Sequence, residues 1–286
     1  MTNKIKDYLS LVKFSHTIFA MPFAFIGFTI GYKEEHLFHL SLLLLVILCM
    51  VFARNAAMGF NRLVDRKFDA ENPRTKEREI PSGKITPQNA KLFVVMNILA
   101  FITCTFFINR LCFYLSPIAI FIVLFYSYVK RFSSLCHYVL SLGLSLAPIG
   151  AYLAIRGEFS LLPILFGMVV FFWVGGFDII YSCQDAEFDS GFDLYSIPSL
   201  LGVKRALLVS TISHVTTAAI LVYIGFIWQF NLPIYILSAS IFSGLMIFQH
   251  SIISPKDLSR VNLAFGTTNG IASVIFATGV ILSILI

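Results

Sequence analysis

Two acidic motifs with the same spacing are the residues of this sequence best suited to bind a charged ligand. Each has a polar residue followed by two aspartates at steps of four: Asn61, Asp65 and Asp69 in the first motif, and Tyr181, Asp185 and Asp189 in the second. On a helix, three side chains so spaced fall within roughly an 80° arc. Carboxylate oxygens suit Mg²⁺, which usually takes one or two of them and completes its shell with waters and phosphate oxygens. If the motifs face each other, we expect two Mg²⁺ ions around one diphosphate.

Cationic side chains accompany both motifs and could hold phosphate oxygens. The candidates for substrate binding are the cations Arg62, Arg74, Arg78, Lys130 and Lys204, together with Tyr126, one turn before Lys130. Arginine can clamp two oxygens at once, which lysine cannot do. The alternative for each cation is a solvated loop residue with no role in binding.

Asp178 and Arg54 lie deeper in the apolar runs than the motifs do. A carboxylate in apolar surroundings needs a partner. One interpretation is a buried Arg54–Asp178 ion pair. The other is a polar pocket for a small anionic substrate, with Asp178, Arg54 and Tyr181 as the catalytic residues.

The composition is that of an integral membrane protein. Of the 286 residues, 58% are hydrophobic and 13% charged, and the mean hydropathy is +0.85. A soluble domain would have about 25% charged residues. Apolar runs of roughly 20 residues recur, and helices satisfy their own backbone in lipid. We therefore expect one all-α membrane domain over 1–286, with the motifs at 61–69 and 178–189 as a weak internal repeat.

About nine membrane spans are predicted, and the charges of their connections alternate. Their ranges are 14–32, 38–60, 88–108, 111–129, 135–155, 161–182, 206–226, 233–251 and 263–286. All of the 21 Lys and Arg residues except Lys33, Arg110 and Arg156 fall on one side. The positive-inside rule makes that side cytoplasmic, with the N-terminus inside and the C-terminus outside. Loop topology thus explains the basic pI, near 9.1, and we expect no nucleic-acid partner.

The histidines and cysteines of the apolar runs are interpreted as structural. His16, His137, His214 and His250 stand singly, which is typical of packed or interfacial histidines. The five cysteines are scattered, without a C-x-x-C pair, so neither a disulfide nor a zinc site is predicted.

Taken together, these motifs resemble the UbiA superfamily of intramembrane aromatic prenyltransferases over nearly the whole chain. The matching segments are Lys13 to Phe19, the Asn61/Asp65/Asp69 motif, Arg74 with Arg78, Tyr126 with Lys130 and Arg131, and Asp178 with Tyr181, Asp185 and Asp189. The resemblance implies a nine-helix bundle in the cell inner membrane with its active site on the cytoplasmic side. It also implies Mg²⁺ held by the four motif aspartates beside Asn61.

The resemblance further implies transfer of a polyprenyl group from a polyprenyl diphosphate to an aromatic acid in quinone synthesis. The run from Arg78 to Pro81, Arg-Glu-Ile-Pro, is similar to 4-hydroxybenzoate polyprenyltransferases. A dihydroxynaphthoate acceptor in menaquinone synthesis is an alternative. An ion-coupled transporter is a second alternative from another class, although its site would lie at mid-membrane and not at span ends.

Overall fold

The computed structural model describes residues 2–12 and 20–286, which fold into helices without a named strand. The Lys13 to Phe19 segment of the family resemblance lies outside these residues. The helices are α1 (Thr2–Leu11), α2 (Met21–Glu35), α3 (Leu40–Glu71), α4 (Pro87–Ile108), α5 (Arg110–Val129), α6 (Cys136–Arg156), α7 (Leu161–Ser182), η2 (Cys183–Asp185), α8 (Ala186–Gly191), α9 (Ile197–Leu201), α10 (Val203–Ile227), α11 (Leu232–Ser251), η3 (Leu263–Thr268) and α12 (Asn269–Leu285).

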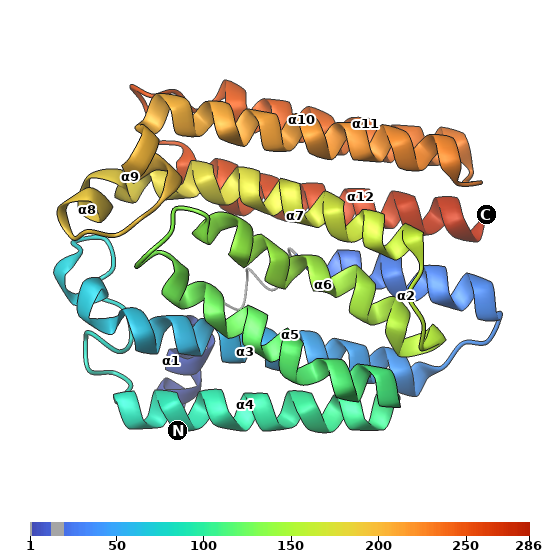
Figure 1. Ribbon diagram of the computed structural model, residues 1–286, viewed down its shortest axis with the longest axis horizontal. Coiled ribbons are helices and arrows are strands. Elements are labelled where there is room, and N and C mark those ends of the chain that lie inside the picture. Colours follow the sequence, from blue (N-terminus) through green and yellow to red (C-terminus); the bar gives the residue numbers. More distant parts are fainter. Residues whose placement is uncertain (1, 13–19) are drawn as a thin grey trace.

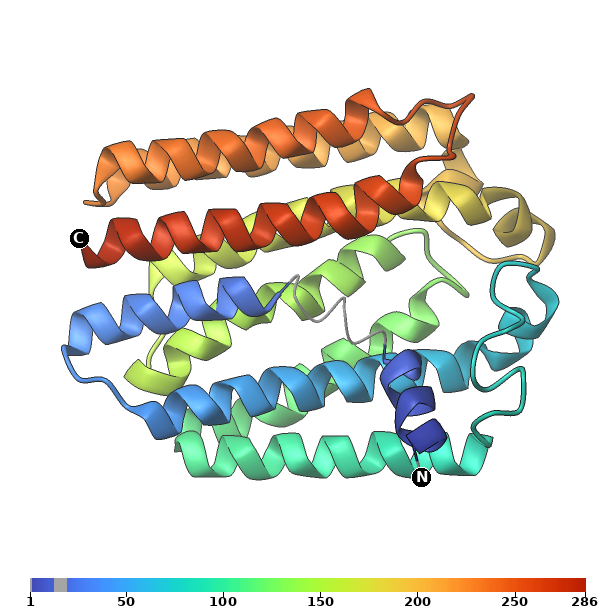
Figure 2. The same ribbon diagram turned by 180° about the vertical axis from the view of Figure 1, so that it is seen from behind.

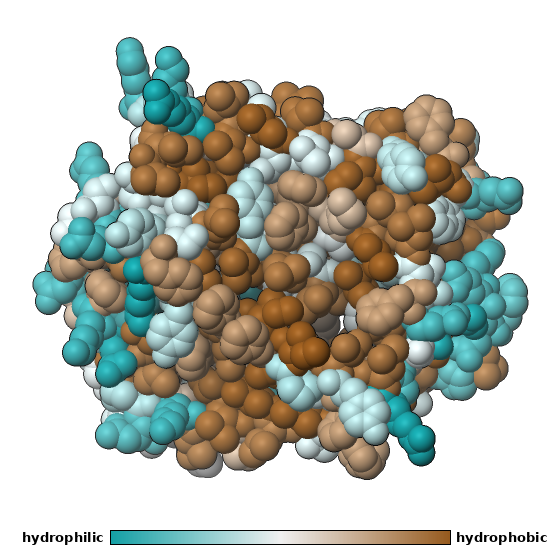
Figure 3. Space-filling view, in the orientation of Figure 1, coloured by the Kyte–Doolittle hydropathy of each residue, from teal (hydrophilic) through white to brown (hydrophobic). Residues whose placement is uncertain are grey.

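The predicted membrane bundle is confirmed. Within the described residues, eight helices are long and apolar enough to cross a bilayer. Helix α2, with 15 residues, lies where the first span was predicted and packs beside α6 and α12. The long helices run side by side (Figures 1 and 2). Apolar side chains cover the middle of the surface and polar ones gather at both ends (Figure 3), as two membrane–water interfaces require.

Local sequence explains where several helices begin and end. The Thr86 side chain accepts a hydrogen bond from the Asn89 amide and Pro87 opens α4, so this start combines an N-cap with a proline that needs no donor. The Asn109 side chain caps α5 through the Cys112 amide, 2.8 Å away. Gly157 ends α6 in the left-handed conformation, at φ 64°, which glycine adopts without strain.

Helix α7 is the centre of the bundle, and the second acidic motif begins in its last turn. It packs between α6 and α10. In its membrane-spanning stretch 67% of the residues are buried, against 11% in that of α3. Trp173 of α7 is fully buried and contacts the rings of Phe23 and Phe242. Because most of α7 is buried between its neighbours, the residues after Phe177 emerge from a well-packed element.

Gly27 lets α2 pack directly on α6. A Cβ atom at this position would lie 1.9 Å from the Pro148 carbonyl oxygen, which is backbone and cannot yield. This agrees with the small-residue contacts that bring membrane helices together.

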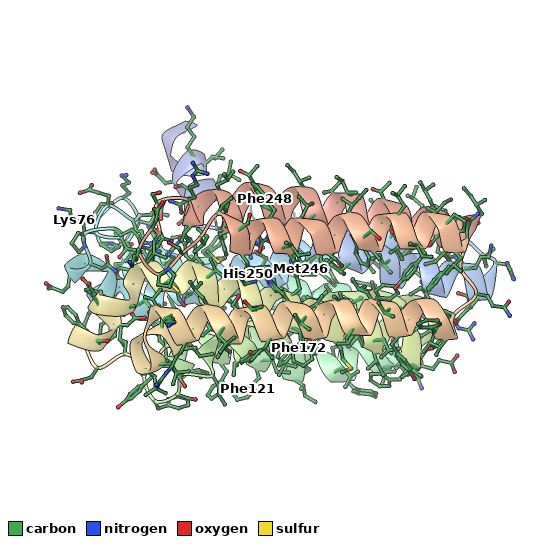
Figure 4. The ribbon with its side chains drawn as sticks, turned by 90° about the horizontal axis from the view of Figure 1, so that it is seen from above. Lys76, Phe121, Phe172, Met246, Phe248 and His250 are labelled. Carbon is green, nitrogen blue, oxygen red and sulfur yellow. The ribbon has the colours of Figure 1, made fainter. Side chains whose placement is uncertain are left out.

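The cation-rich connections gather at one end of the bundle. The loop from 72 to 86, the turn from 130 to 135, and α8 and α9 all lie at the left in Figure 1, opposite the C-terminus. Lys76 marks the same end when the bundle is seen from above, whereas Phe121 points outward from its side (Figure 4). The sequence prediction that both motifs share one end is therefore met by the fold.

The predicted helical periodicity is interrupted between Asp178 and Asp189. Helix α7 ends at Ser182, residues Cys183–Asp185 form a 3₁₀ turn, and α8 resumes the α-helix. A 3₁₀ turn has fewer residues per turn than an α-helix, so the second motif does not continue one straight helical face. The first motif, in contrast, lies wholly within α3.

Candidate active site

A polar cavity of about 570 Å³ opens at the cation-rich end and brings the two motifs together. Every site residue predicted from the sequence lines it except Lys204: Arg54, Asn61, Arg62, Asp65, Asp69, Arg74, Arg78, Tyr126, Lys130, Asp178, Tyr181, Asp185 and Asp189. Residues more than 100 positions apart in the chain thus face one space.

In the first motif, Asp65 is buried and held by cations from the α5–α6 connection. Lys130 Nζ lies 2.8 Å from one Asp65 oxygen, and Arg131 Nη2 lies 3.3 Å from the other. Asn61 donates its side-chain amide to Asp65 at 3.1 Å, so it supports the carboxylate from one turn earlier in α3. Arg131, which was not predicted to be a binding residue, therefore helps to orient this aspartate.

Asp69 is paired on one oxygen only. Arg78 from the following loop donates to its Oδ1 at 2.7 Å. Its Oδ2 is buried and has no hydrogen-bond partner within residues 2–12 and 20–286. A buried carboxylate oxygen without a partner is costly, so this atom is suited to a ligand that brings positive charge.

Arg74 joins the second motif to the loop that follows the first. Its guanidinium forms a two-pronged ion pair with Asp185 and donates to the Tyr181 hydroxyl at 2.8 Å. Burial lowers the pKa of Arg74, but the hydrogen bonds and charge of Asp185 and Tyr181 outweigh it and raise the pKa overall. Asn72 adds a donor to the same carboxylate at 3.2 Å.

Arg54 and Tyr126 lie at the depth of the cavity, where they also line a second space. Arg54 Nε is buried and without a partner in the described part of the chain. The Arg54–Asp178 ion pair considered from the sequence does not form between these residues, because Asp178 instead contacts His137 at 2.7 Å. An arginine with a spare buried donor suits an anionic group of a ligand.

The second space is an apolar cavity of about 330 Å³ between α3, α5 and α6. Five residues line both cavities, so the two spaces adjoin each other: Arg54, Met58, Tyr126, Leu140 and Leu144. The surface is hollowed near its middle in Figure 3, where α5 and α6 lie in Figure 1. A molecule with a charged head and a long apolar tail fits this pair of spaces.

Lys204 is not brought to the site. It is exposed in the first turn of α10 and is absent from the cavity lining. The short helix α9 and the turn at Gly202, with φ 77°, separate it from the second motif. The prediction for Lys204 rested on its closeness to the motif in the sequence, which does not reveal the intervening helix α9.

The charged side chains of the site form ion pairs with one another, and a charged ligand could take the place of either partner. Asp65, Asp69 and Asp185 are each neutralised by arginine or lysine. Divalent cations at the carboxylates would release these side chains to phosphate oxygens, for which guanidinium and ammonium groups are good donors. The cavity can therefore hold metal ions and a diphosphate together.

Comparison with known proteins identifies the family. The sequence model of the UbiA prenyltransferase family matches residues 20–276. The chain belongs to the UbiA prenyltransferase family. This confirms the prediction of a prenyltransferase over that of a transporter.

Individual members of the UbiA prenyltransferase family agree with this chain over most of its length. It is 28% identical over 237 residues to the 4-hydroxybenzoate octaprenyltransferase of Tolumonas auensis, covering 83% of this chain and 82% of that protein. The apo structure of a UbiA homolog from Aeropyrum pernix K1 matches with a TM-score of 0.82 at 30% identity, over 93% of this chain and 97% of that one. A UbiA homolog from Archaeoglobus fulgidus, bound to DMAPP and Mg²⁺, shares the fold with a TM-score of 0.75 at 22% identity, over 97% and 99% of the two chains.

His137 and Phe265 are among the residues lining this UbiA-family cavity that were not predicted from the sequence. His137 was interpreted as a packing histidine, yet it lines the cavity and contacts Asp178. Phe265, from the π-helical turn η3, lines the cavity with its ring centroid 4.1 Å from that of Tyr181. The only sequence signal for His137 was its own position, as a polar residue near the start of the predicted span 135–155. No sequence pattern pointed to Phe265.

Proposed function

We propose that this protein transfers a polyprenyl group from polyprenyl diphosphate to a 4-hydroxybenzoate-like aromatic acid in quinone synthesis, with Mg²⁺, at the cytoplasmic face of the inner membrane. The observation that carries the proposal is that a polar cavity and an apolar cavity adjoin each other. Acidic motifs and cations line one end, an apolar space forms the other, and Arg54 and Tyr126 stand at the junction. The curated relative from Tolumonas auensis, a 4-hydroxybenzoate octaprenyltransferase, supports this choice of acceptor.

The carboxylates fit Mg²⁺ by their chemistry and by the partnerless oxygen of Asp69. The ions would be held by Asp65 and Asp69, with Asn61 beside them, and by Asp185 and Asp189. In the described residues, no cluster of three acidic, histidine or cysteine side chains is close enough to hold an ion alone. That agrees with a site completed by phosphate oxygens and water, as is usual for Mg²⁺. When bound, the metal would supply Lewis-acid stabilisation of the leaving diphosphate.

The chain's own cations would take up the charge that develops on the diphosphate. Arg62, Arg74, Arg78 and Lys130 line the cavity around the carboxylates. Fixed donors aimed at a developing charge lower the barrier more in a partly enclosed site than in water. The allylic carbon–oxygen bond then breaks, and its electron pair leaves with the diphosphate.

The acceptor ring would lie at the junction, with its carboxylate on the spare donor of Arg54. A ring carbon ortho to the phenol oxygen forms the new carbon–carbon bond. The ring proton goes to the carboxylate of Asp178, which lines the same cavity. The apolar walls exclude water that would otherwise capture the cation.

The decisive test is a membrane assay with Mg²⁺, labelled polyprenyl diphosphate and a panel of acceptors. We expect prenylated 4-hydroxybenzoate as the main product, and its loss in EDTA with recovery on adding Mg²⁺. A product formed only from dihydroxynaphthoate would reassign the acceptor. Absence of product from every acceptor would reject the proposed function.

A further inference from the structure

His137 touches two segments that lie far from it in the sequence. It stands in the first turn of α6 and is 3% exposed. Its Nδ1 lies 2.7 Å from Oδ2 of Asp178 in α7. Its Nε2 lies 3.3 Å from the backbone nitrogen of Ile197, the first residue of α9. One imidazole thus connects α6, α7 and α9.

The backbone of Ile197 decides which ring nitrogen of His137 carries the hydrogen. A backbone N–H can only donate, so Nε2 of His137 must accept and carries a lone pair. In a neutral ring the hydrogen then sits on Nδ1, which donates to Asp178. The hydrogen bond from the Ile197 backbone N–H to Nε2 therefore selects this tautomer of His137.

The Ile197 donor is itself held in place. Ser196 and Ser199 form a capping box at the start of α9. The backbone N–H of Tyr195, two residues before Ile197, donates to the Lys130 carbonyl oxygen at 2.6 Å. The segment that fixes the tautomer is therefore anchored to the end of α5.

Asp178 receives this hydrogen bond on one oxygen while its side chain remains 19% exposed to the cavity. A carboxylate held by one oxygen presents the other in a defined direction. Resting on the proposed function, in which Asp178 accepts the ring proton, we propose that His137 is a positioning residue. Its neutral, Nδ1-protonated ring holds Asp178 in the orientation that receives the proton from the acceptor.

Two nearly isosteric substitutions separate this role from packing. His137→Asn places an amide N–H where Nδ1 stood and keeps the donor to Asp178, whereas His137→Leu has the same shape without it. Neither can accept from Ile197. We expect kcat of the Asn variant to stay within about threefold of the wild type, and that of the Leu variant to fall by about tenfold or more, as for a lost hydrogen bond to a charged group. KM for the prenyl diphosphate should be unchanged in both.

Equal kcat values for the Asn and Leu variants, whether high or low, would overturn the positioning role. Both variants are checked for a monodisperse peak in detergent, and nitrogen NMR of the ¹⁵N-histidine-labelled full chain provides a readout independent of activity. The signal that disappears in His137→Asn should be that of a neutral ring protonated on Nδ1. A ring protonated on Nε2, or on both nitrogens, would refute the inference. Absence of product from the wild-type chain would instead reject the proposed function, and the catalytic part of the inference with it.

Discussion

In this cavity each ion pair joins an aspartate to an arginine or lysine, and a bound ligand could replace either partner. Asp185 receives Arg74 on both oxygens, and Asp65 receives Lys130 and Arg131. Removing one partner of such a pair leaves the other charge uncompensated, which costs more than the pair contributes. The aspartates are therefore expected to affect both catalysis and the order of the surrounding loops.

Asp185→Asn tests the second motif at the level of one atom pair. We expect activity to fall by about 100-fold or more, because one proposed metal-binding charge and the anchor of Arg74 are lost together. The control is Glu187→Gln, an exposed carboxylate two residues away that does not line the cavity. Prenyl transfer is measured for both in the same membranes, and comparable activity would remove Asp185 from the metal site.

The helices and turns that position these side chains are only partly predictable from the sequence. Helix α3 carries the first motif without interruption to Glu71, whereas the second motif is divided by the turn at Cys183–Asp185. Helix α9, five residues long, moves Lys204 away from the cavity and places the Ile197 N–H on His137. Short elements of this kind lack a periodic pattern, so hydropathy cannot locate them.

Gly27→Ala tests the packing of α2 against α6. Because the new Cβ would meet the Pro148 carbonyl, we expect a loss of about 1–3 kcal/mol in stability and a lower midpoint of thermal unfolding in detergent. Gly244→Ala in α11 is the matched control, since no atom lies within 4 Å of its Cβ position. Equal midpoints for the two variants would contradict the close approach of α2 and α6.

At the scale of the whole molecule, the bundle has one charged end and an apolar interior that continues from it. The apolar cavity extends from Arg54 and Tyr126 between α3, α5 and α6. Gly150 of α6 lines this cavity and has no atom within 4 Å of its Cβ position. It lies six residues beyond Leu144, or about 9 Å further along the helix.

Gly150→Phe should therefore obstruct the tail of a long prenyl donor and spare a short one. We expect a lower rate with an eight-isoprene diphosphate than with geranyl diphosphate, measured with the same acceptor. Gly244→Phe, on α11 and outside both cavities, should change the two rates equally. An equal effect of Gly150→Phe on both donors would place the prenyl chain elsewhere.

The orientation of the bundle in the membrane is a further prediction at this scale. The cationic loops predict a cytoplasmic active site and an external C-terminus. A reporter fused after Ile286 that is active only outside the cytoplasm should give signal, and one inserted near Lys76 should not. The reverse pattern would invert the orientation.

The sequence alone determined the membrane class, the approximate spans and the two motifs, because hydropathy and four-residue spacing are local properties. The family membership and fold confirm the enzyme class, while the roles of the site residues stay predictions. Only the tertiary structure decided that Asp178 meets His137 and not Arg54, that Lys204 lies outside the cavity, and that Phe265 lies inside it. Such contacts depend on the rotation and tilt of helices distant in the chain. Those are set by packing, such as that of Gly27 on Pro148, which no single segment encodes.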